Sequence, residues 1–331
     1  MVEAGEMQRE LASVRESAEQ VRAQITARFL GQDDVVEELL VALLADGHVL
    51  LEGAPGLGKT MLVRSLSRAL DLDFRRVQCT PDLMPADVLG TRILDEDERG
   101  GRRFRFEMGP VFTHVLLADE INRATPRTQA ALLEAMAERQ VTIFGETHAL
   151  PVPFFVVATQ NPIEMEGTYP LPEAQLDRFL MKIDVGAPAL DALVAILEQT
   201  TGTPEADGSV ILAREALLRA RALVREVPVS RDMLALAARL VIATRPEDSL
   251  APENVRRFVR YGSSPRGAQS LILAAKARAL LQGRLFVDEG DLARLAPSTL
   301  RHRLILNYEA DASGTRASDL IRDAFERARR G

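Results

Sequence analysis

The sequence predicts an α/β domain built on a parallel sheet flanked by helices, followed by a small all-α domain. Three observations support this fold class. Short apolar runs alternate with helical segments as far as residue 188, which is typical of parallel strands buried on both faces. A glycine-rich loop directly follows the first of these runs and precedes a helical pattern. Beyond residue 188 the chain becomes rich in Ala, Leu and Arg at helical spacing.

The first part of the chain contains five predicted strands and two predicted hairpins. The strands comprise residues 48–51, 74–78, 114–118, 154–158 and 180–184. The hairpins pair residues 91–94 with 103–106 and residues 141–144 with 147–150. The second hairpin turns at Gly145-Glu146, and glycine is a common residue in tight hairpin turns. The strands are separated by helical segments, so the connections predict a parallel sheet.

Four segments follow from these patterns. They are an N-terminal helix in residues 1–30, a core domain in 31–188, a linker region in 189–209 and a helical domain in 210–331. Apolar positions make residues 7–29 an amphipathic helix that Gly31 ends, and Asp33 and Asp34 suit the start of the next helix. The most polar part of the linker is residues 200–209, which contain Gly, Pro and Ser. Helices of the last domain are expected near 213–226, 230–244, 266–282, 288–295 and 315–329.

The composition is that of an ordinary globular protein, with 331 residues, 47% of them hydrophobic and 27% charged. The formal charge of −7 argues against broad binding to nucleic acid or to an anionic membrane. The single cysteine, Cys79, excludes an internal disulfide and a cysteine-cluster metal site, and we expect it to be buried and inert. The N-terminus does not resemble a signal peptide, and no apolar run is long enough to cross a bilayer. We therefore expect a cytoplasmic protein without membrane insertion.

The glycine-rich loop matches the pattern G-x-x-x-x-G-K-[ST] without a gap. Its residues are Gly53, Ala54, Pro55, Gly56, Leu57, Gly58, Lys59 and Thr60. Its glycines let backbone N–H groups turn toward phosphates at the start of the next helix, which opens with Met61. Lys59 can reach the outer phosphates, and the Thr60 hydroxyl can ligate Mg²⁺. The loop therefore predicts nucleotide binding, with Met61 included among the binding residues.

Two carboxylates end the third predicted strand, at Asp119 and Glu120. Ligands of an open parallel sheet lie at the carboxyl ends of its strands, the edge that also carries the glycine-rich loop. We therefore expect Asp119 to hold Mg²⁺, directly or through water, and Glu120 to act as the general base on an attacking water. The pair would be a weak signal without the loop some 60 residues earlier.

Three further polar residues are candidates for the same reaction. Asn161 ends the fourth strand, where it can orient the attacking water, although Asn before Pro also favours a turn. Arg178 precedes the fifth strand and becomes catalytic only if a neighbouring subunit places its nucleotide there. Arg266 lies in the first turn of a helix capped by Ser264, where a cation is unfavourable unless an anion compensates it.

With these residues the chain resembles the AAA+ ATPases, and more narrowly the MoxR family within the helix-2-insert clade. The loop matches Walker A, 116–120 match Walker B, Asn161 matches sensor 1, Arg178 the arginine finger and Arg266 sensor 2. Other characteristic stretches are 80–87, 119–124, 158–162 and 263–266, and the hairpin at 91–106 matches the insert that defines the clade. The resemblance covers roughly residues 15–330.

The resemblance implies an ATPase in which ATP lies between a core domain and a helical lid, with subunits assembled into a ring, usually of six. It implies a chaperone-like role in maturing protein complexes, often with a partner that carries a von Willebrand factor A domain. By the same resemblance Gly31 and Gln32 lie near adenine. Arg266 acts on its own nucleotide or on a neighbour's, and Gln78 either restrains Glu120 or is simply a polar strand end.

Other functions compete with ATP-driven remodelling. A nucleic-acid motor is disfavoured because residues 95–103 at the first hairpin tip are half acidic and residues 144–148 at the second contain no Lys or Arg. A scaffold that binds ATP without hydrolysing it is disfavoured by the intact Glu120, Asn161 and Arg178. A metal-chelatase motor subunit has nearly the same site pattern and stays open. Neither tip carries the aromatic triplet of threading unfoldases, which favours local remodelling.

Overall fold

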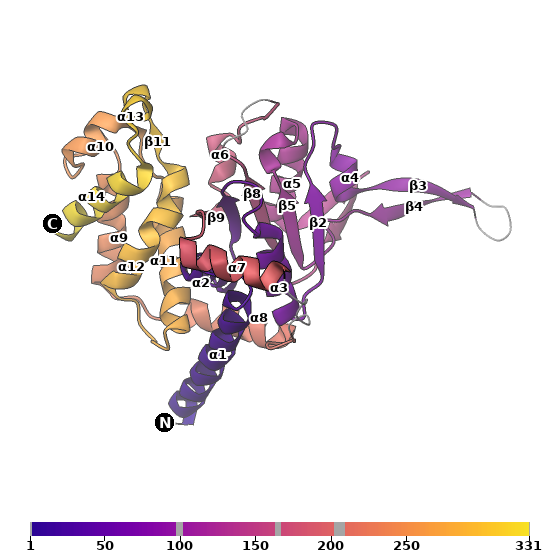
Figure 1. The fold of residues 1–331 in the computed structure, drawn as a ribbon, viewed down its shortest axis with the longest axis horizontal. Helices are drawn as coiled ribbons and strands as arrows, with labels where there is room; N and C mark the ends of the chain where they lie inside the picture. The colour runs from indigo at the N-terminus through magenta and orange to yellow at the C-terminus, as the bar shows by residue number, and fades with distance from the viewer. Residues whose placement is uncertain (1, 97–101, 163–166, 202–208, 331) are drawn as a thin grey trace.

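The computed structural model describes residues 2–96, 102–162, 167–201 and 209–330. Its centre is a five-stranded parallel sheet in the order β2-β5-β8-β1-β9 (Figure 1). The strands are β1 (His48–Glu52), β2 (Phe74–Gln78), β5 (Val115–Asp119), β8 (Phe155–Gln160) and β9 (Phe179–Asp184). These are the five predicted strands. The runs are apolar because β1, β5 and β8 are buried on both faces.

Helices cover both faces of this sheet. They include α1 (Val2–Thr26), α2 (Asp33–Leu44), α3 (Lys59–Ala69), α4 (Pro85–Leu89) and α5 (Pro126–Glu138), with the short elements η1 (Ile121–Arg123) and α6 (Glu173–Leu176). Alternate residues of β5 join different cores, because Leu117 belongs to the cluster that includes α2 and α3 whereas Leu116 belongs to the cluster that includes α5. Helix α1 begins earlier than expected and ends three residues before Phe29, whose side chain is nevertheless buried.

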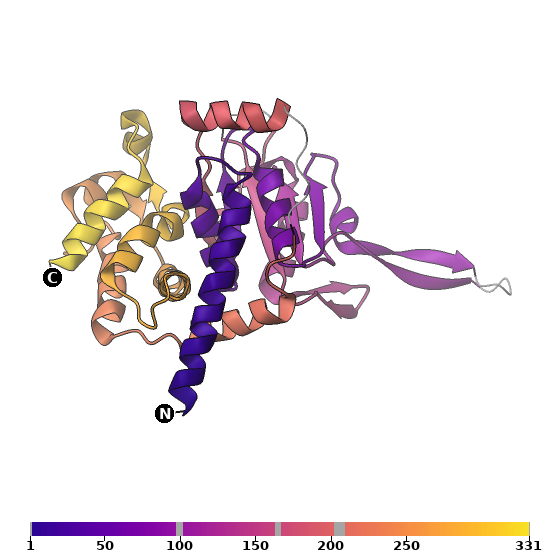
Figure 2. The ribbon, with the colours of Figure 1, turned by 60° about the horizontal axis from the view of Figure 1, so that its bottom comes forward.

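Two antiparallel hairpins interrupt the alternation of strands and helices, as predicted. They are β3 (Gly90–Glu96) with β4 (Arg102–Met108), and β6 (Gln140–Ile143) with β7 (Glu146–Ala149). The first is longer than expected and projects far from the core (Figures 1 and 2). Its base packs on the second hairpin, because the ring of Phe106 stacks on that of His148 with their centroids 4.3 Å apart. Most of the predicted acidic tip, residues 97–101, lies outside the described residues.

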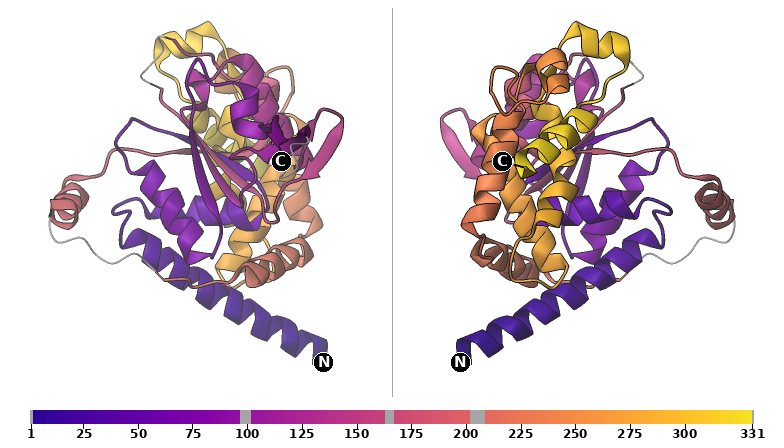
Figure 3. Two further views of the ribbon diagram at one scale, coloured as in Figure 1. Left: turned by 90° about the vertical axis from the view of Figure 1, so that its right-hand side faces the viewer. Right: turned by 90° about the vertical axis from the view of Figure 1, so that its left-hand side faces the viewer.

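The region predicted to be a linker, residues 189–209, contains a helix that the sequence analysis did not predict. Helix α7 (Leu190–Thr201) occupies its first part, because the sequence stays apolar up to Leu197 and becomes polar only at residues 198–201. The part from 202 to 208 is outside the described residues. Helix α7 lies at the periphery of the core domain (Figure 3), and its Leu190, Val194 and Leu197 side chains are exposed.

The C-terminal part is helical, as expected. The five predicted helices are α8 (Arg214–Glu226), α9 (Arg231–Ala243), α11 (Pro265–Leu281), α12 (Glu289–Leu300) and α14 (Ala317–Arg329). Short elements that the sequence did not predict are α10 (Glu253–Phe258), β10 (Val259–Tyr261), η2 (Arg301–Arg303), β11 (Ile305–Leu306) and α13 (Tyr308–Ser313). Strands β10 and β11 pair with each other.

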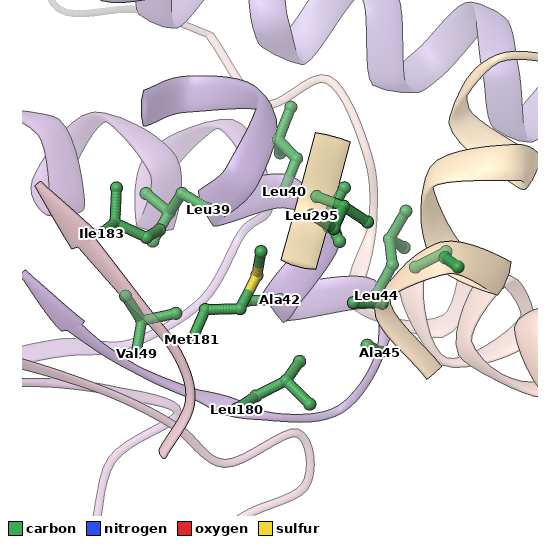
Figure 4. Packing of buried hydrophobic residues seen from close by; sticks show 14 of the residues in the cluster. Leu39, Leu40, Ala42, Leu44, Ala45, Val49, Leu180, Met181, Ile183 and Leu295 are labelled. Carbon is green, nitrogen blue, oxygen red and sulfur yellow. The ribbon is translucent and has the colours of Figure 1, made fainter. Parts of the chain in front are cut away.

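This helical domain packs against the β9 edge of the sheet and against α2. Figure 4 shows Leu295 of α12 in one cluster with Leu40 of α2 and Met181 of β9. Ion pairs join the same surfaces, since Arg294 Nη1 lies 2.7 Å from Glu38 Oε1. The lid is therefore docked beside the sheet. Among the described residues, no helix combines the length and apolar character needed to cross a bilayer.

Candidate active site

The glycine-rich loop connects the end of β1 to the start of α3. Gly56 and Gly58 have φ angles of +80° and +76°, which side chains other than glycine rarely adopt. Lys59, the first residue of α3, is largely buried, and its Nζ donates to the carbonyl oxygens of Gly53 at 2.5 Å and Ala54 at 3.2 Å. Thr60 follows in the same turn. This geometry fits phosphate, because a helix N-terminus and a lysine are placed at one loop.

The charge of Lys59 depends on its surroundings. Burial lowers the pKa of its ammonium group, whereas the nearby carboxylates of Asp119 and Glu120 act to raise it. An anionic ligand at the loop would favour the charged form further.

A cavity of about 300 Å³ adjoins the loop. Its apolar walls include Phe29, Leu30, Leu57, Met61, Leu193 and Ile196. Gln32 also lines it, donating from Nε2 to the carbonyl oxygen of Gly186 at 2.9 Å. Its Oε1 is buried without a hydrogen-bond partner, which leaves an acceptor for a ligand such as the amino group of adenine. The cavity therefore fits a flat, largely apolar base with an amino group.

Helix α7 closes this cavity. All of the described residues that line it fall between 28 and 200, so the lid of residues 210–331 does not contribute to the cavity. This cavity therefore gives no support to the expectation that ATP lies between core and lid, which stays a prediction. Gly31 does not line it. Its φ is +75°, and an added Cβ would lie 2.5 Å from Ala192 Cβ, so this glycine lets α7 approach.

The two carboxylates lie at the carboxyl end of β5, as predicted. Asp119 is the last residue of the strand, and Glu120 adopts a left-handed conformation with φ 57°. The buried hydroxyl of Thr159 connects them, because it donates to Asp119 Oδ1 at 2.6 Å and accepts from the Glu120 backbone N–H at 2.8 Å. Sequence reasoning did not assign Thr159 a role, although it lies in the characteristic stretch at 158–162.

The side chain of Glu120 is restrained by two donors. Gln78 Nε2 donates to Glu120 Oε2 at 2.9 Å, and Arg123 Nη1 donates to the same oxygen at 3.2 Å. Gln78 is therefore a partner of Glu120, which decides between the two alternatives left open by the sequence. Arg76 adds to this network by donating to Gln78 Oε1 and, at 2.9 and 2.7 Å, to Asp119 Oδ2. The sequence analysis missed Arg76 and Arg123, although strand alternation places Arg76 and Gln78 on one face of β2.

Asn161 lies at the same sheet edge. It is buried directly after β8, next to Gln160, whose carbonyl oxygen accepts from the Gly53 N–H at 3.2 Å. The structure thus gathers Lys59, Asp119, Glu120 and Asn161 at the carboxyl ends of neighbouring strands.

Arg178 and Arg266 lie at the other edge of the sheet, where the parallel strands begin. Arg178 precedes β9, whose first residue, Phe179, pairs with His48 at the start of β1, while the loop follows the far end of β1. The five residues of β1 put about 16 Å between these two edges. Arg178 Nη1 donates to the carbonyl oxygen of Leu133 at 2.9 Å, and Arg266 Nη1 lies 3.5 Å from Asp177 Oδ2. The structure therefore does not bring these two arginines to the loop of their own chain.

Two smaller expectations are also met. Ser264 caps α11, because its Oγ accepts from the Arg266 backbone N–H at 3.2 Å, and Pro265 is the first residue of the helix. Cys79 is buried, and this burial raises the pKa of its thiol to about 12. A thiol with that pKa stays protonated at neutral pH and is a poor nucleophile.

Comparisons with known proteins agree with this arrangement. Residues 48–181 match the model of the ATPase family associated with various cellular activities (AAA), and residues 251–324 match the AAA lid domain. Chaperone MoxR1 of Mycobacterium tuberculosis is 44% identical over 300 residues, which are 91% of this chain and 78% of the relative. Protein MoxR of Methylorubrum extorquens is 34% identical over 96% of both chains. A crystal structure from Cytophaga hutchinsonii superposes with a TM-score of 0.91 at 37% identity, covering 99% of this chain and 98% of the other.

AAA ATPases bind ATP and typically form oligomers, and both the core and the lid of this chain match that family. The matches to two MoxR proteins cover 91% and 96% of this chain at 44% and 34% identity, which narrows the assignment from AAA ATPases in general to the MoxR type. The chain belongs to the MoxR-type AAA ATPases and is related to the chaperone MoxR1.

Proposed function

We propose that this protein hydrolyses ATP with Mg²⁺ as one subunit of a ring, usually of six, and uses the cycle to remodel or mature a partner protein complex. The observation that carries the proposal is the division of the site between two edges of one chain. Lys59 and Glu120 lie at one edge and Arg178 at the other. A head-to-tail contact between copies brings the two edges together, and repeated contacts of that kind close a ring.

Each residue at the nucleotide edge has a part in the reaction. Lys59 and the loop amides hold the phosphates, and Gln32 Oε1 accepts a hydrogen bond from the amino group of adenine. Bound Mg²⁺ would neutralise charge on the outer phosphates, with Thr60 and Asp119 as its protein ligands. Glu120 accepts a proton from the attacking water, which Asn161 orients.

The neighbouring copy completes the site with cations. Arg178 and Arg266 of that copy approach the outer phosphate and stabilise the charge that develops on it, an effect worth 10³–10⁵ in rate in comparable systems. Because Arg266 lies beside Asp177 at the far edge, the structure favours its action on the neighbour's nucleotide over action on its own.

The partner is proposed to be a protein, of the class that carries a von Willebrand factor A domain. The relative named Chaperone MoxR1 supports a chaperone-like role. A nucleic-acid motor is less favoured by the first hairpin. There, Arg105 Nε lies 3.2 Å from Asp95 Oδ2 and its Nη2 lies 3.1 Å from Glu107 Oε2, so its charge is compensated within the hairpin. A metal-chelatase motor and a non-catalytic scaffold have no observation of their own in their favour.

Mixing two inactive variants tests the division of the site. Lys59→Ala lacks the phosphate-binding lysine, and Arg178→Ala lacks the cation offered to the neighbour. In a 1:1 mixture about a quarter of head-to-tail interfaces join an intact Lys59 to an intact Arg178. We expect ATPase activity to recover toward that fraction of the wild-type rate. Absence of recovery, with subunit exchange verified by mixing fluorescently labelled chains, would refute the shared site.

The class of partner is tested separately. We expect proteins with a von Willebrand factor A domain to bind more tightly in the ATP state, and by linkage to alter ATP binding or turnover. Single-stranded and duplex DNA should leave turnover unchanged at physiological salt. Strong stimulation by DNA that decreases steeply with added salt would favour the nucleic-acid motor instead.

A further inference from the structure

The lid contains a buried arginine whose bonds converge on the segment that carries Arg178. Arg303 ends η2, and its side chain is only 3% exposed. A guanidinium removed from water must be compensated by acceptors, because an unpaired buried charge strongly destabilises the fold. Most of the acceptors that Arg303 uses belong to the core domain.

These acceptors lie on both sides of residue 178. Arg303 Nε donates to Asp177 Oδ1 at 2.7 Å, and Nη2 donates to the carbonyl oxygen of Phe179 at 2.8 Å. Weaker bonds, both 3.3 Å, reach the carbonyl oxygens of Asp177 and Leu180. Within the lid, Nη2 also donates to Ser270 Oγ at 3.0 Å, which ties the same guanidinium to α11.

Asp177 extends this link to the second exposed cation. Its Oδ1 accepts from the buried Arg303, while its Oδ2 lies 3.5 Å from the Nη1 of Arg266, whose side chain is 70% exposed. The Asp177 carboxylate therefore contacts both the buried Arg303 and the exposed Arg266, and Asp177 is adjacent in sequence to Arg178.

We propose that Asp177 and Arg303 are positioning residues that hold Arg178 and Arg266 as one unit at the face presented to the neighbouring nucleotide. Since Arg303 belongs to the lid, a movement of the lid in one subunit displaces the arginine that acts on the next subunit. The pair thus couples the lid of one copy to hydrolysis in its neighbour. The inference rests on the proposed action of Arg178 in trans.

The alternative is that Arg303 only anchors the lid to the core domain and has no effect on catalysis. The chain contains a matched control for this alternative. Arg221 of α8 is also buried, donating from Nη1 to Asp46 Oδ1 at 2.5 Å and from Nε to the carbonyl oxygen of Leu43 at 2.9 Å. This second ion pair joins the lid to the end of α2 and has no contact with residues 177–180 among the described interactions. Arg221→Lys and Arg303→Lys both keep the charge and lose the planar fork of donors.

The test compares these two variants for turnover and thermal stability. We expect Arg303→Lys to lower kcat between about 10- and 100-fold, because a displacement of about 1 Å can cost 10²-fold, with the KM for ATP within about threefold of wild type. Arg221→Lys should lower the melting temperature comparably and leave kcat within about threefold. Asp177→Asn keeps an acceptor for Arg303 and loses the charge that faces Arg266, so about a fivefold loss of kcat is expected.

Mixing with Lys59→Ala separates the outcomes. We expect Arg303→Lys to regain activity in that mixture, as Arg178→Ala does, because both defects act on the neighbour's nucleotide. If the Arg178→Ala mixture stays inactive, the shared site fails and the inference fails with it. If the Arg178→Ala mixture recovers, either of two results overturns the inference. One is a folded Arg303→Lys variant with wild-type kcat, and the other is a mixture of Arg303→Lys with Lys59→Ala that regains no activity. Should Arg303→Lys not fold, Asp177→Asn decides by the same two measurements.

Discussion

Replacing Gln78 by alanine should raise the basal rate of ATP hydrolysis. Glu120 can accept a proton only when its carboxylate turns toward the attacking water, and Gln78 and Arg123 hold its Oε2 by donating to it at 2.9 and 3.2 Å. Each donor stabilises a resting orientation of the carboxylate. Removing one lowers the free energy needed to turn Glu120 toward the attacking water.

The structure sets the size of the effect. A hydrogen bond to a charged group is worth about 1.5–3 kcal/mol when buried. The side chain of Glu120 is 21% exposed and Arg123 remains in place, so about 1–1.4 kcal/mol is a suitable value for Gln78. That free energy corresponds to an increase in kcat of about five- to tenfold.

Steady-state phosphate release at saturating ATP measures the effect. The KM and the affinity for a fluorescent ATP analogue should stay close to wild type, because Gln78 is not among the residues assigned to the nucleotide. Arg75→Ala, one residue before Arg76 on the other face of β2, is the control. In a Glu120→Gln background the Gln78 substitution should have no effect. A lower kcat for Gln78→Ala would refute the reasoning and assign Gln78 to the active orientation of Glu120.

Three further predictions address binding, chemistry and stability. Lys59→Ala should weaken ATP binding about 10- to 100-fold in equilibrium titration, and wild-type hydrolysis by this variant would contradict the site. Glu120→Gln should bind ATP normally and lose about 10²–10⁴-fold in turnover. Because this variant keeps ATP bound, ATP should lengthen the lifetime of its oligomer in size-exclusion chromatography, and profiles unchanged by ATP would count against nucleotide-linked assembly. Burial lowers the pKa of His48 to about 4, so as pH falls from 6.5 toward 4 the unfolded chain binds a proton that the folded chain does not, and about 3 kcal/mol of stability is lost. Melting temperatures between pH 7.5 and 5 should fall more for wild type than for His48→Gln, and equal slopes would exclude His48 as the source.

Local patterns were enough to predict most of the fold. The five strands could be located because each is a short run of residues that must be apolar when both faces of a parallel sheet are covered. The Walker A loop could be interpreted because its conformation depends on glycines within eight residues. Helix α7 was missed because its apolar residues were grouped with the polar segment that follows them. The six-residue helices α10 and α13 are too short to show helical periodicity.

Contacts between distant segments could not be predicted. Gln78 reaches Glu120 because β2 pairs with β5 in a register that places Gln78 beside Asp119, and nothing in either strand alone reveals that register. The contribution of Thr159 depends on β8 lying next to β5. The position of Arg266 was left open because it depends on where the lid docks, which is fixed by long-range contacts such as that between Arg303 and Asp177.

The same docking has a consequence for a chain on its own. With Arg178 and Arg266 at the far edge and with no lid residue among those described around the cavity, an isolated chain lacks both cations at its nucleotide. ATPase activity per subunit should therefore rise with protein concentration through the range in which oligomers form. The rise should reach at most the roughly 10³- to 10⁵-fold rate increase that an arginine supplied by a neighbour gives in comparable systems. Sedimentation at the same concentrations gives the oligomeric fraction, and the two curves should coincide. Arg178→Ala should assemble over the same range without the rise in rate. Full activity per subunit in dilute wild-type monomers would place a sufficient set of cations within one chain and exclude the division of the site.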